Sequence, residues 1–179
     1  MCYYYIYRSP VGELAIASNE ENIIGLWLEG QRYYMDVLQG KDYQEKETAV
    51  IKLAEEWLDR YFKGEKPKIK ELPIEFIGSD FRKQVWTILC EIPYGKVITY
   101  GDIAKELARQ KKIEKMSAQA VGGAVGRNPI SIIVPCHRVV GANGSLTGYS
   151  GGVKVKTKLL KLEEVDMSKL YIPTKGTAL

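Results

Sequence analysis

Cys136 is the residue of this 179-residue sequence whose surroundings most clearly suggest chemistry. It lies in the segment Ile132-Ile-Val-Pro-Cys-His-Arg-Val-Val140, directly before His137, which is the single histidine of the chain. A thiol attacks an electrophile as the thiolate, and a neighbouring imidazole or a cation such as Arg138 favours that form. A lone cysteine is usually a small buried hydrophobe. The neighbours of Cys136 therefore carry the prediction that it is a nucleophile.

A nucleophilic cysteine also needs a base that is held in place. An imidazole in this role is usually oriented by a third polar group, and Glu163 and Glu164, on an expected C-terminal helix, are the candidates. Neighbouring side chains on an extended backbone point to opposite sides. His137 can therefore reach the sulfur only if the backbone turns there, or through a water molecule.

The cysteine count limits the other uses of these residues. Cys2, Cys90 and Cys136 are too few and too scattered for a disulfide framework, and with one histidine they do not form a zinc pattern. We expect Cys90 in a helix core and assign nothing to Cys2. These features are typical of a reducing, intracellular setting. We also expect no membrane span and no secretory signal, because no run of eighteen apolar residues and no basic-then-apolar leader is present.

Charge divides the chain into two halves. Residues 1–75 carry 10 basic and 14 acidic side chains, a net charge of −4, whereas residues 76–179 carry 16 and 8, a net charge of +8. A basic half is typical of a surface that binds a polyanion, nucleic acid first. A solvated lysine surface is the alternative, and charge alone does not decide between the two.

The acidic half should consist of strands and one helix. Aromatic and apolar runs separated by turn residues predict three hairpin-linked strands, over residues 3–7, 14–18 and 23–28. Apolar residues at helical spacing predict a helix over about 47–62, and Gly64 is placed to end it. Residues 64–75 are the expected linker between two domains, 1–75 and 76–179.

The basic half should be mostly helical. Asp80, Thr99 and Ser117 are expected to cap three helices, the second near residues 100–109 and the third, with small side chains, reaching about Val125. Two short helices joined by a turn suit a helix-turn-helix or a plain helical hairpin, and the pattern alone leaves both open. Residues 132–134 are expected to form a buried strand that Pro135 ends.

The segment Pro135–Val140 resembles the active-site signature of the O6-alkylguanine-DNA alkyltransferases. Five further blocks, three before this segment and two after it, occur in that family's order, and those from Ala120 to Glu163 keep its spacing. The match covers residues 76–165 well, whereas residues 1–75 match only as a strand-rich domain of similar size. The five blocks are Val97-Ile-Thr-Tyr-Gly101, Ala120-Val-Gly-Gly-Ala124, Asn128-Pro129, Gly148-Tyr-Ser-Gly-Gly152, and Lys156 with Leu159-Leu160 and Glu163.

The resemblance implies a two-domain α/β fold. Residues 1–75 would form a small antiparallel sheet with one helix against it, similar to half of ribonuclease H. Residues 76–179 would form a winged-helix-like helix-turn-helix domain that contains the acceptor site.

The resemblance also implies roles for individual residues. Cys136 would accept the alkyl group, His137 would act as its base through a bound water, and Glu163 would orient His137. Asn128 would tie the recognition helix to the strand that bears Cys136. The residues that would line or close the guanine pocket are Tyr100, Val139, Tyr149, Ser150 and Lys156.

The third helix would enter the minor groove of DNA, which is only about 6 Å wide and excludes bulky side chains. Tyr100 would crowd the phosphate of the target nucleotide and help to rotate it out of the duplex. The expected DNA-binding residues are Tyr100, Gln119, Ala120, Gly123, Arg127, Arg109, Lys111 and Lys112.

Two features depart from the family pattern. The family usually has an arginine one helical turn before the paired glycines, where it inserts into the base stack, and this chain has Gln119. The turn between the two helices is a few residues longer than usual. We expect its basic residues, Arg109, Lys111, Lys112 and Lys115, to supply phosphate contacts that offset the missing arginine.

The activity implied is DNA repair by direct reversal, on double-stranded DNA that contains O6-alkylguanine. The modified oxygen lies inside the base stack, so the nucleotide must be flipped out before Cys136 can reach the alkyl carbon. The product is a thioether that thiol exchange does not reverse, so each molecule would act once, without cofactor or metal. We expect a monomer in the cytoplasm.

Three alternatives belong to other classes. A non-catalytic alkylguanine sensor of the same fold would lack the acceptor cysteine, which this chain has. A DNA-binding regulator with a redox- or alkylation-sensing cysteine would leave Glu163 without a role. A cysteine hydrolase with a Cys136–His137–Glu163 triad would turn over many times and would not need a basic helix-turn-helix.

Overall fold

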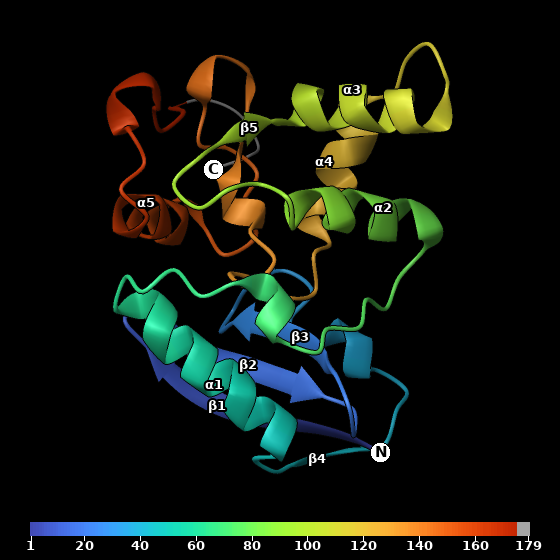
Figure 1. Cartoon of the computed structure of the whole chain (residues 1–179), viewed down its shortest axis with the longest axis vertical. Helices are drawn as coiled ribbons and strands as arrows, with labels where there is room; N and C mark the ends of the chain where they lie inside the picture. Colours follow the sequence, from blue (N-terminus) through green and yellow to red (C-terminus); the bar gives the residue numbers. More distant parts are fainter. Residues whose placement is uncertain (175–179) are drawn as a thin grey trace. The chain divides into compact units, whose positions relative to one another are not determined.

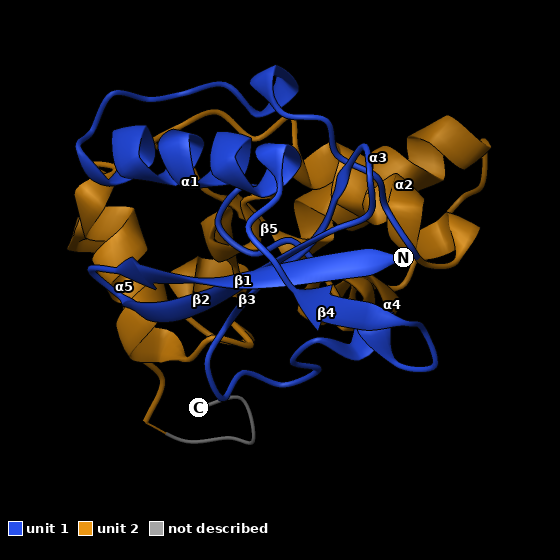
Figure 2. Cartoon of the chain, turned by 90° about the horizontal axis from the view of Figure 1, so that it is seen from below, with its two compact units in different colours: residues 1–77, 129–133 blue, residues 78–128, 134–179 orange. Residues whose placement is uncertain are grey.

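The computed structural model describes residues 1–174 of the chain and divides them into two compact units. The first contains Met1–Ile77 together with Pro129–Ile133, and the second contains Gly78–Asn128 and the chain from Val134 onward (Figure 2). The sequence-based boundary at residue 75 gave no indication that a five-residue segment would return to the first unit.

The first unit is built on a four-stranded sheet in the order β3-β2-β1-β4 (Figure 1). The three predicted strands are confirmed and pair antiparallel, as expected. A fourth, short strand was not predicted, and it pairs parallel to β1. The strands are β1 (Cys2–Ser9), β2 (Gly12–Ser18), β3 (Ile23–Leu28) and β4 (Tyr43–Glu45).

Helix α1 (Ala49–Phe62) packs against this sheet. The Thr48 side chain caps its N-terminus by accepting a hydrogen bond from the backbone of Ile51, so the helix begins two residues later than predicted. Gly64 adopts φ 80°, the left-handed conformation in which glycine ends a helix at little cost. Trp57 and Tyr61 on the buried face stack with their ring planes 8° apart.

The segment Pro129–Ile133 extends the edge of the sheet beside β3. The backbone of Leu26 donates to Pro129 O at 2.8 Å, and Ser131 N donates back to Leu26 O at 2.9 Å. The predicted strand over residues 132–134 is wrong, although its residues are buried. Ile132 has φ 69° and Ile133 N bonds to Ser131 O, which is a tight turn. The apolar pattern reports burial, and a turn buried this completely cannot be distinguished from a short strand by composition.

The second unit is mostly helical (Figure 1). The first of its helices is capped by Ser79, not by Asp80 as predicted, because the Ser79 hydroxyl accepts from Arg82 N while Asp80 occupies the first turn. The predicted caps Thr99 and Ser117 are confirmed, and Thr99 forms a reciprocal capping box with Asp102. The helices are α2 (Asp80–Leu89), α3 (Tyr100–Lys111), α4 (Ala118–Gly126) and α5 (Val153–Leu162).

Helices α3 and α4 pack against each other, and α4 also packs on α2, as in a helix-turn-helix. The indole of Trp86 in α2 donates to Ala124 O in α4 at 2.8 Å. This bond and the buried apolar face of α4 fix the orientation of the helix, so that its opposite face lies at the surface.

A short parallel pair joins the start of α3 to the chain beyond Cys136. Strand β5 (Ile98–Thr99) pairs with β6 (Val139–Val140). Because Tyr100 follows β5 directly and Cys136 precedes β6 by three residues, this pair brings the two into one neighbourhood. The described chain also contains 3-10 helices over Asp36–Leu38, Ile69–Glu71, Cys136–Arg138, Ala142–Gly144 and Met167–Lys169.

Residues beyond the predicted family core take part in the second unit. Tyr171 exchanges backbone hydrogen bonds with Gly144 and Leu146, and Met167 and Leu170 pack against a cluster around Leu160. No helix within residues 1–174 is both long and apolar enough to cross a membrane.

Candidate active site

Cys136 is the first residue of the 3-10 helix Cys136–Arg138, and Pro135 precedes it. The backbone therefore turns at the cysteine, which is one of the two ways in which His137 could act on the sulfur. Cys136 is only 4% exposed. Burial raises the pKa of its thiol, while a hydrogen bond with Asn128 and the charge of Lys156 act in the opposite direction. The resting thiol consequently keeps its proton, and a base is needed to remove it.

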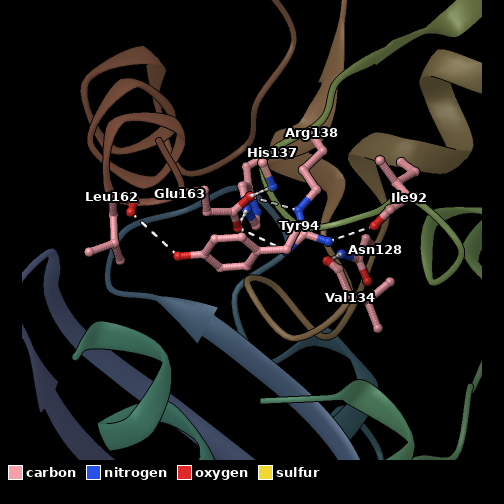
Figure 3. A network of polar contacts seen from close by, with 9 residues as sticks. Ile92, Tyr94, Asn128, Val134, His137, Arg138, Leu162 and Glu163 are labelled. Atoms are coloured by element: carbon pink, nitrogen blue, oxygen red, sulfur yellow. Dashed lines mark hydrogen bonds and ion pairs between the residues drawn. The ribbon is translucent and has the colours of Figure 1, made fainter. Parts of the chain in front are cut away.

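His137 and Glu163 form the predicted pair. The imidazole Nε2 lies 2.7 Å from Oε1 of Glu163, and both side chains are completely buried (Figure 3). The carboxylate accepts this hydrogen bond, so Nε2 carries the proton. The other ring nitrogen, Nδ1, is buried and has no hydrogen-bond partner within residues 1–174. Glu163 is the C-terminal cap of α5, whereas Glu164, the other candidate, is exposed.

Burial lowers the pKa of His137, and the charges of Arg138 and Lys156 lower it further, while Glu163 acts against them. Burial alone would raise the pKa of Glu163, but hydrogen bonds and charges from His137 and Arg138 hold it well below its usual range. The pair is thus a neutral imidazole on an ionised carboxylate, which is the state of a base ready to accept a proton.

Arg138 takes part in this network more fully than the sequence indicated. Its Nε and Nη2 donate to the two oxygens of Glu163 at 2.8 and 2.9 Å, and its Nη1 donates to Ile92 O at 2.7 Å. The guanidinium also lies 5.6 Å from the ring centre of Tyr94 (Figure 3). From the sequence, Arg138 was expected only as a cation near the thiol.

Asn128 follows α4 by two residues and links it to the turn before the cysteine. Its amide Nδ2 donates to Val134 O at 2.9 Å, and the side chain is buried. The expected tie is therefore to a turn, because residues 132–134 are not a strand.

Two of the residues expected around a guanine, Tyr100 and Lys156, donate hydrogen bonds to the same backbone carbonyl. Tyr100 donates from its hydroxyl to Thr147 O at 3.1 Å, and Lys156 Nζ donates to the same oxygen at 3.1 Å and to Val139 O. Burial raises the pKa of Tyr100 to about 12 and lowers that of Lys156 to about 8. Thr147 was not singled out from the sequence, because its contribution is a backbone oxygen.

Two more expected pocket residues lie on the segment after Thr147. The Tyr149 hydroxyl is buried and has no hydrogen-bond partner within residues 1–174, and burial raises its pKa well above the usual value. Ser150, the next residue, is partly buried. Gly148 precedes them with φ 81°, and a β-carbon there would lie 2.5 Å from the Tyr100 hydroxyl. Glycine is therefore required at this position for Tyr100 to reach Thr147.

The exposed face of α4 carries the small residues expected at DNA. Gln119, Ala120 and Gly123 are exposed and Arg127 is partly exposed, at a spacing that places them on one side of the helix. No atom of residues 1–174 lies within 4 Å of a β-carbon built at Gly123, so the described structure leaves this side open.

The basic turn differs from the expectation in one respect. Helix α3 continues through Lys111, two residues beyond the predicted end, so Lys111 lies in the helix and not in the turn, as does Arg109. Its guanidinium is engaged with the Glu106 carboxylate through Nε at 2.9 Å and Nη2 at 2.6 Å. Lys111 and Lys112 are exposed.

Fold and site together define a class: a helix-turn-helix protein with a buried cysteine beside a histidine–glutamate pair. Within residues 1–174, no group of three or more histidine, cysteine or acidic side chains could hold a metal ion. Such a constellation suits nucleophilic chemistry at sulfur on a nucleic acid.

Comparison with known proteins identifies the family. Residues 80–165 match the family model described as 6-O-methylguanine DNA methyltransferase, DNA binding domain, and residues 2–76 match the model of its ribonuclease-like domain. The chain belongs to the 6-O-methylguanine DNA methyltransferase family.

Similar proteins of known name and structure agree with this assignment. A methylated-DNA–protein-cysteine methyltransferase of Methanosarcina acetivorans is 41% identical over 90% of this chain and 97% of its own, and that of Haemophilus influenzae is 39% identical over 91% and 87%. The crystal structure of Mycobacterium tuberculosis OGT in complex with DNA superposes with a TM-score of 0.79 at 37% identity, over 90% of this chain and 92% of that one.

Proposed function

We propose that this protein repairs DNA by direct reversal, transferring the alkyl group from O6-alkylguanine to Cys136 once per molecule. The observation that carries the proposal is the buried cysteine on a turn, followed by a histidine whose Nε2 is held by Glu163 and whose Nδ1 has no hydrogen-bond partner among the described residues. The family membership and the names of its relatives support the reaction.

The burial of Cys136 decides how the substrate must arrive. A base inside a duplex cannot contact a sulfur that is 4% exposed. The damaged nucleotide therefore has to leave the stack and enter the protein. Helix α4 enters the minor groove with Ala120 and Gly123 toward the DNA, Gln119 fills the space of the extruded base, and Lys111 and Lys112 contact phosphates.

In the transfer step one bond forms at sulfur and one breaks at oxygen. His137 Nδ1 takes the thiol proton through a water molecule, and the thiolate attacks the alkyl carbon in line with the O6–C bond. The electrons of that bond remain on the guanine, which regains a proton at nitrogen or oxygen. The product is a thioether on Cys136 and an unmodified guanine, with no co-reactant consumed.

The pocket residues align and stabilise the guanine. The hydroxyl of Tyr149, which has no partner in the described part of the chain, is the donor for the leaving base. Tyr100 and Lys156 hold the wall of the pocket by fixing Thr147 O, and the apolar side chain of Val139 completes it. Ser150 lies beside Tyr149 and contributes a second hydroxyl. Asn128 supports the thiolate and the turn that carries it.

The proposed site of action is the cytoplasm, where the DNA substrate and a reducing environment coincide. All three cysteines are free, which suits that compartment.

A titration of repair against protein concentration tests this function. Duplex DNA with one O6-methylguanine is incubated to completion with substoichiometric protein, and restored guanine is counted. One guanine restored per protein molecule is expected. Many guanines per molecule would indicate a hydrolase, and tight binding without restoration would indicate a sensor or a regulator.

A further inference from the structure

Arg138 has no part in the transfer described above, yet it is buried at the centre of the site. It is 7% exposed, and its guanidinium bonds to both oxygens of Glu163 and to Ile92 O. Burial of an ionised guanidinium is costly unless it is paired and hydrogen-bonded. A buried arginine at this cost is expected to position or stabilise the groups that it contacts, Glu163 first.

The carboxylate of Glu163 is shared among several donors. Oε1 contacts His137 Nε2 at 2.7 Å and accepts from Arg138 Nη2 at 2.9 Å. Oε2 accepts from Arg138 Nε at 2.8 Å and from Gly95 N at 3.3 Å. Both oxygens are therefore fixed in position, and the negative charge that faces the imidazole is balanced by the guanidinium.

This balance matters for the histidine. An uncompensated carboxylate beside a buried imidazole favours the imidazolium, which can no longer accept a proton. A carboxylate that is already paired still accepts the Nε2 proton but attracts a second proton less strongly. The unpartnered Nδ1 is then the basic atom of the ring.

We propose that Arg138 is a positioning residue: by holding both oxygens of Glu163, it keeps the proton of a neutral His137 on Nε2 and leaves Nδ1 as the acceptor for the Cys136 proton. The inference rests on the proposed role of His137 as the base.

The charged and titratable groups that act on His137 determine the direction of the effect. Burial lowers its pKa most, Glu163 acts in the opposite direction, and the charges of Arg138 and Lys156 lower it further. Cys136, the preceding residue, is a neutral thiol at rest because burial raises its pKa. Loss of Arg138 alone leaves Glu163 less compensated, so the pKa of His137 rises and the base is lost to protonation at a higher pH.

The first test uses the unaltered protein. His137 is the single histidine of the chain, so its ring nitrogens can be read by 15N NMR without competing signals. At pH 6.5 the spectrum should report a neutral ring with the proton on Nε2. An imidazolium at that pH, or a proton on Nδ1, would overturn the proposal.

The second test compares variants. In Arg138→Met, the His137 titration and the acid limb of the single-turnover transfer rate should both move up by about one pH unit or more. Arg138→Lys, which keeps the charge, should leave His137 neutral at pH 6.5. Arg60→Met removes an exposed arginine–glutamate pair in the first unit and should change neither quantity.

The outcomes separate three possibilities. If Arg138→Met lowers the melting temperature but leaves both pH midpoints unchanged, Arg138 is structural only and the proposal fails. If Arg138→Met does not fold, the decision rests on the His137 tautomer in the wild type and on the charge of His137 in Arg138→Lys. A charged His137 at pH 6.5 in either protein contradicts the proposal. Methyl transfer by the wild type with a failed histidine prediction removes this inference alone, whereas absence of transfer removes the proposed function.

Discussion

Replacement of Asn128 by alanine should weaken both the fold and the chemistry, because one side chain supports both. The amide donates to Val134 O at 2.9 Å in a buried setting and forms a hydrogen bond with Cys136. Asn128→Ala leaves a buried carbonyl without this donor, which costs about 1–3 kcal/mol. For a chain of this size, each kcal/mol lowers the melting temperature by roughly 2–4 °C.

The same change removes a contact that favours the thiolate. The pKa of Cys136 should rise, and each unit of that rise corresponds to about 1.4 kcal/mol, or about tenfold less thiolate at a given pH. The assay is the single-turnover rate of methyl transfer from an O6-methylguanine duplex as a function of pH. We expect a slower rate at pH 7 that recovers partly as the pH increases.

Two further variants give this test its controls. Asn128→Asp keeps the shape but loses the Nδ2 donor and adds a negative charge near sulfur, so it should be slower than Asn128→Ala. Asn19→Ala removes an exposed amide that bonds to Glu75 at 2.7 Å in the first unit, and it should change neither rate nor pH profile. Unchanged stability and an unchanged rate for Asn128→Ala would refute the reasoning.

Three other predictions concern pH, salt and DNA affinity. Burial lowers the pKa of Lys156 to about 8 from 10.5, so the unfolded chain binds more protons between these values. The unfolding free energy of the wild type, compared with Lys156→Met in urea titrations, should therefore rise as the pH increases from 8 to 10.5; a fall would contradict the assigned burial. Replacing Lys111 and Lys112 with glutamine should reduce the slope of log affinity against log salt by about 2, whereas Arg109→Gln, already paired with Glu106, should reduce it less. Gln119→Arg should tighten binding to damaged duplex more than Gln110→Arg, which adds the same charge on α3; equal effects would show that only net charge matters.

Much of the fold follows from local patterns. The three strands and α1 were predictable because alternating apolar runs, turn residues and a helix-spaced apolar face all agree. The caps Thr99 and Ser117 were predictable from side-chain chemistry. Ser79 was missed because serine and aspartate side by side are both good caps, and the sequence does not say which one starts the helix.

The turn before Cys136 could not be derived from pattern. Residues 130–134 are all buried, and all of them except Ser131 are apolar, which composition reports correctly. Their path is set by backbone bonds from Leu26 to Pro129 and Ser131, more than 100 positions away in sequence. Long-range pairing of this kind leaves no local signal.

The sequence predicts the part of the site that consists of reactive side chains. Cys136, His137 and Glu163 could be found by residue type and by resemblance. The role of Thr147 could not, because a backbone oxygen has no residue-specific signature. The bidentate hold of Arg138 on Glu163 depends on the geometry of the 3-10 turn, which the sequence does not specify.

The most direct test of the account is the intact mass of the protein after reaction with excess duplex DNA bearing one O6-methylguanine. We expect a gain of one methyl group, located on Cys136, that Cys136→Ala abolishes and Cys90→Ala leaves unchanged. An unmodified protein after complete repair, or a methyl group on another residue, would contradict the assignment of Cys136 as the acceptor.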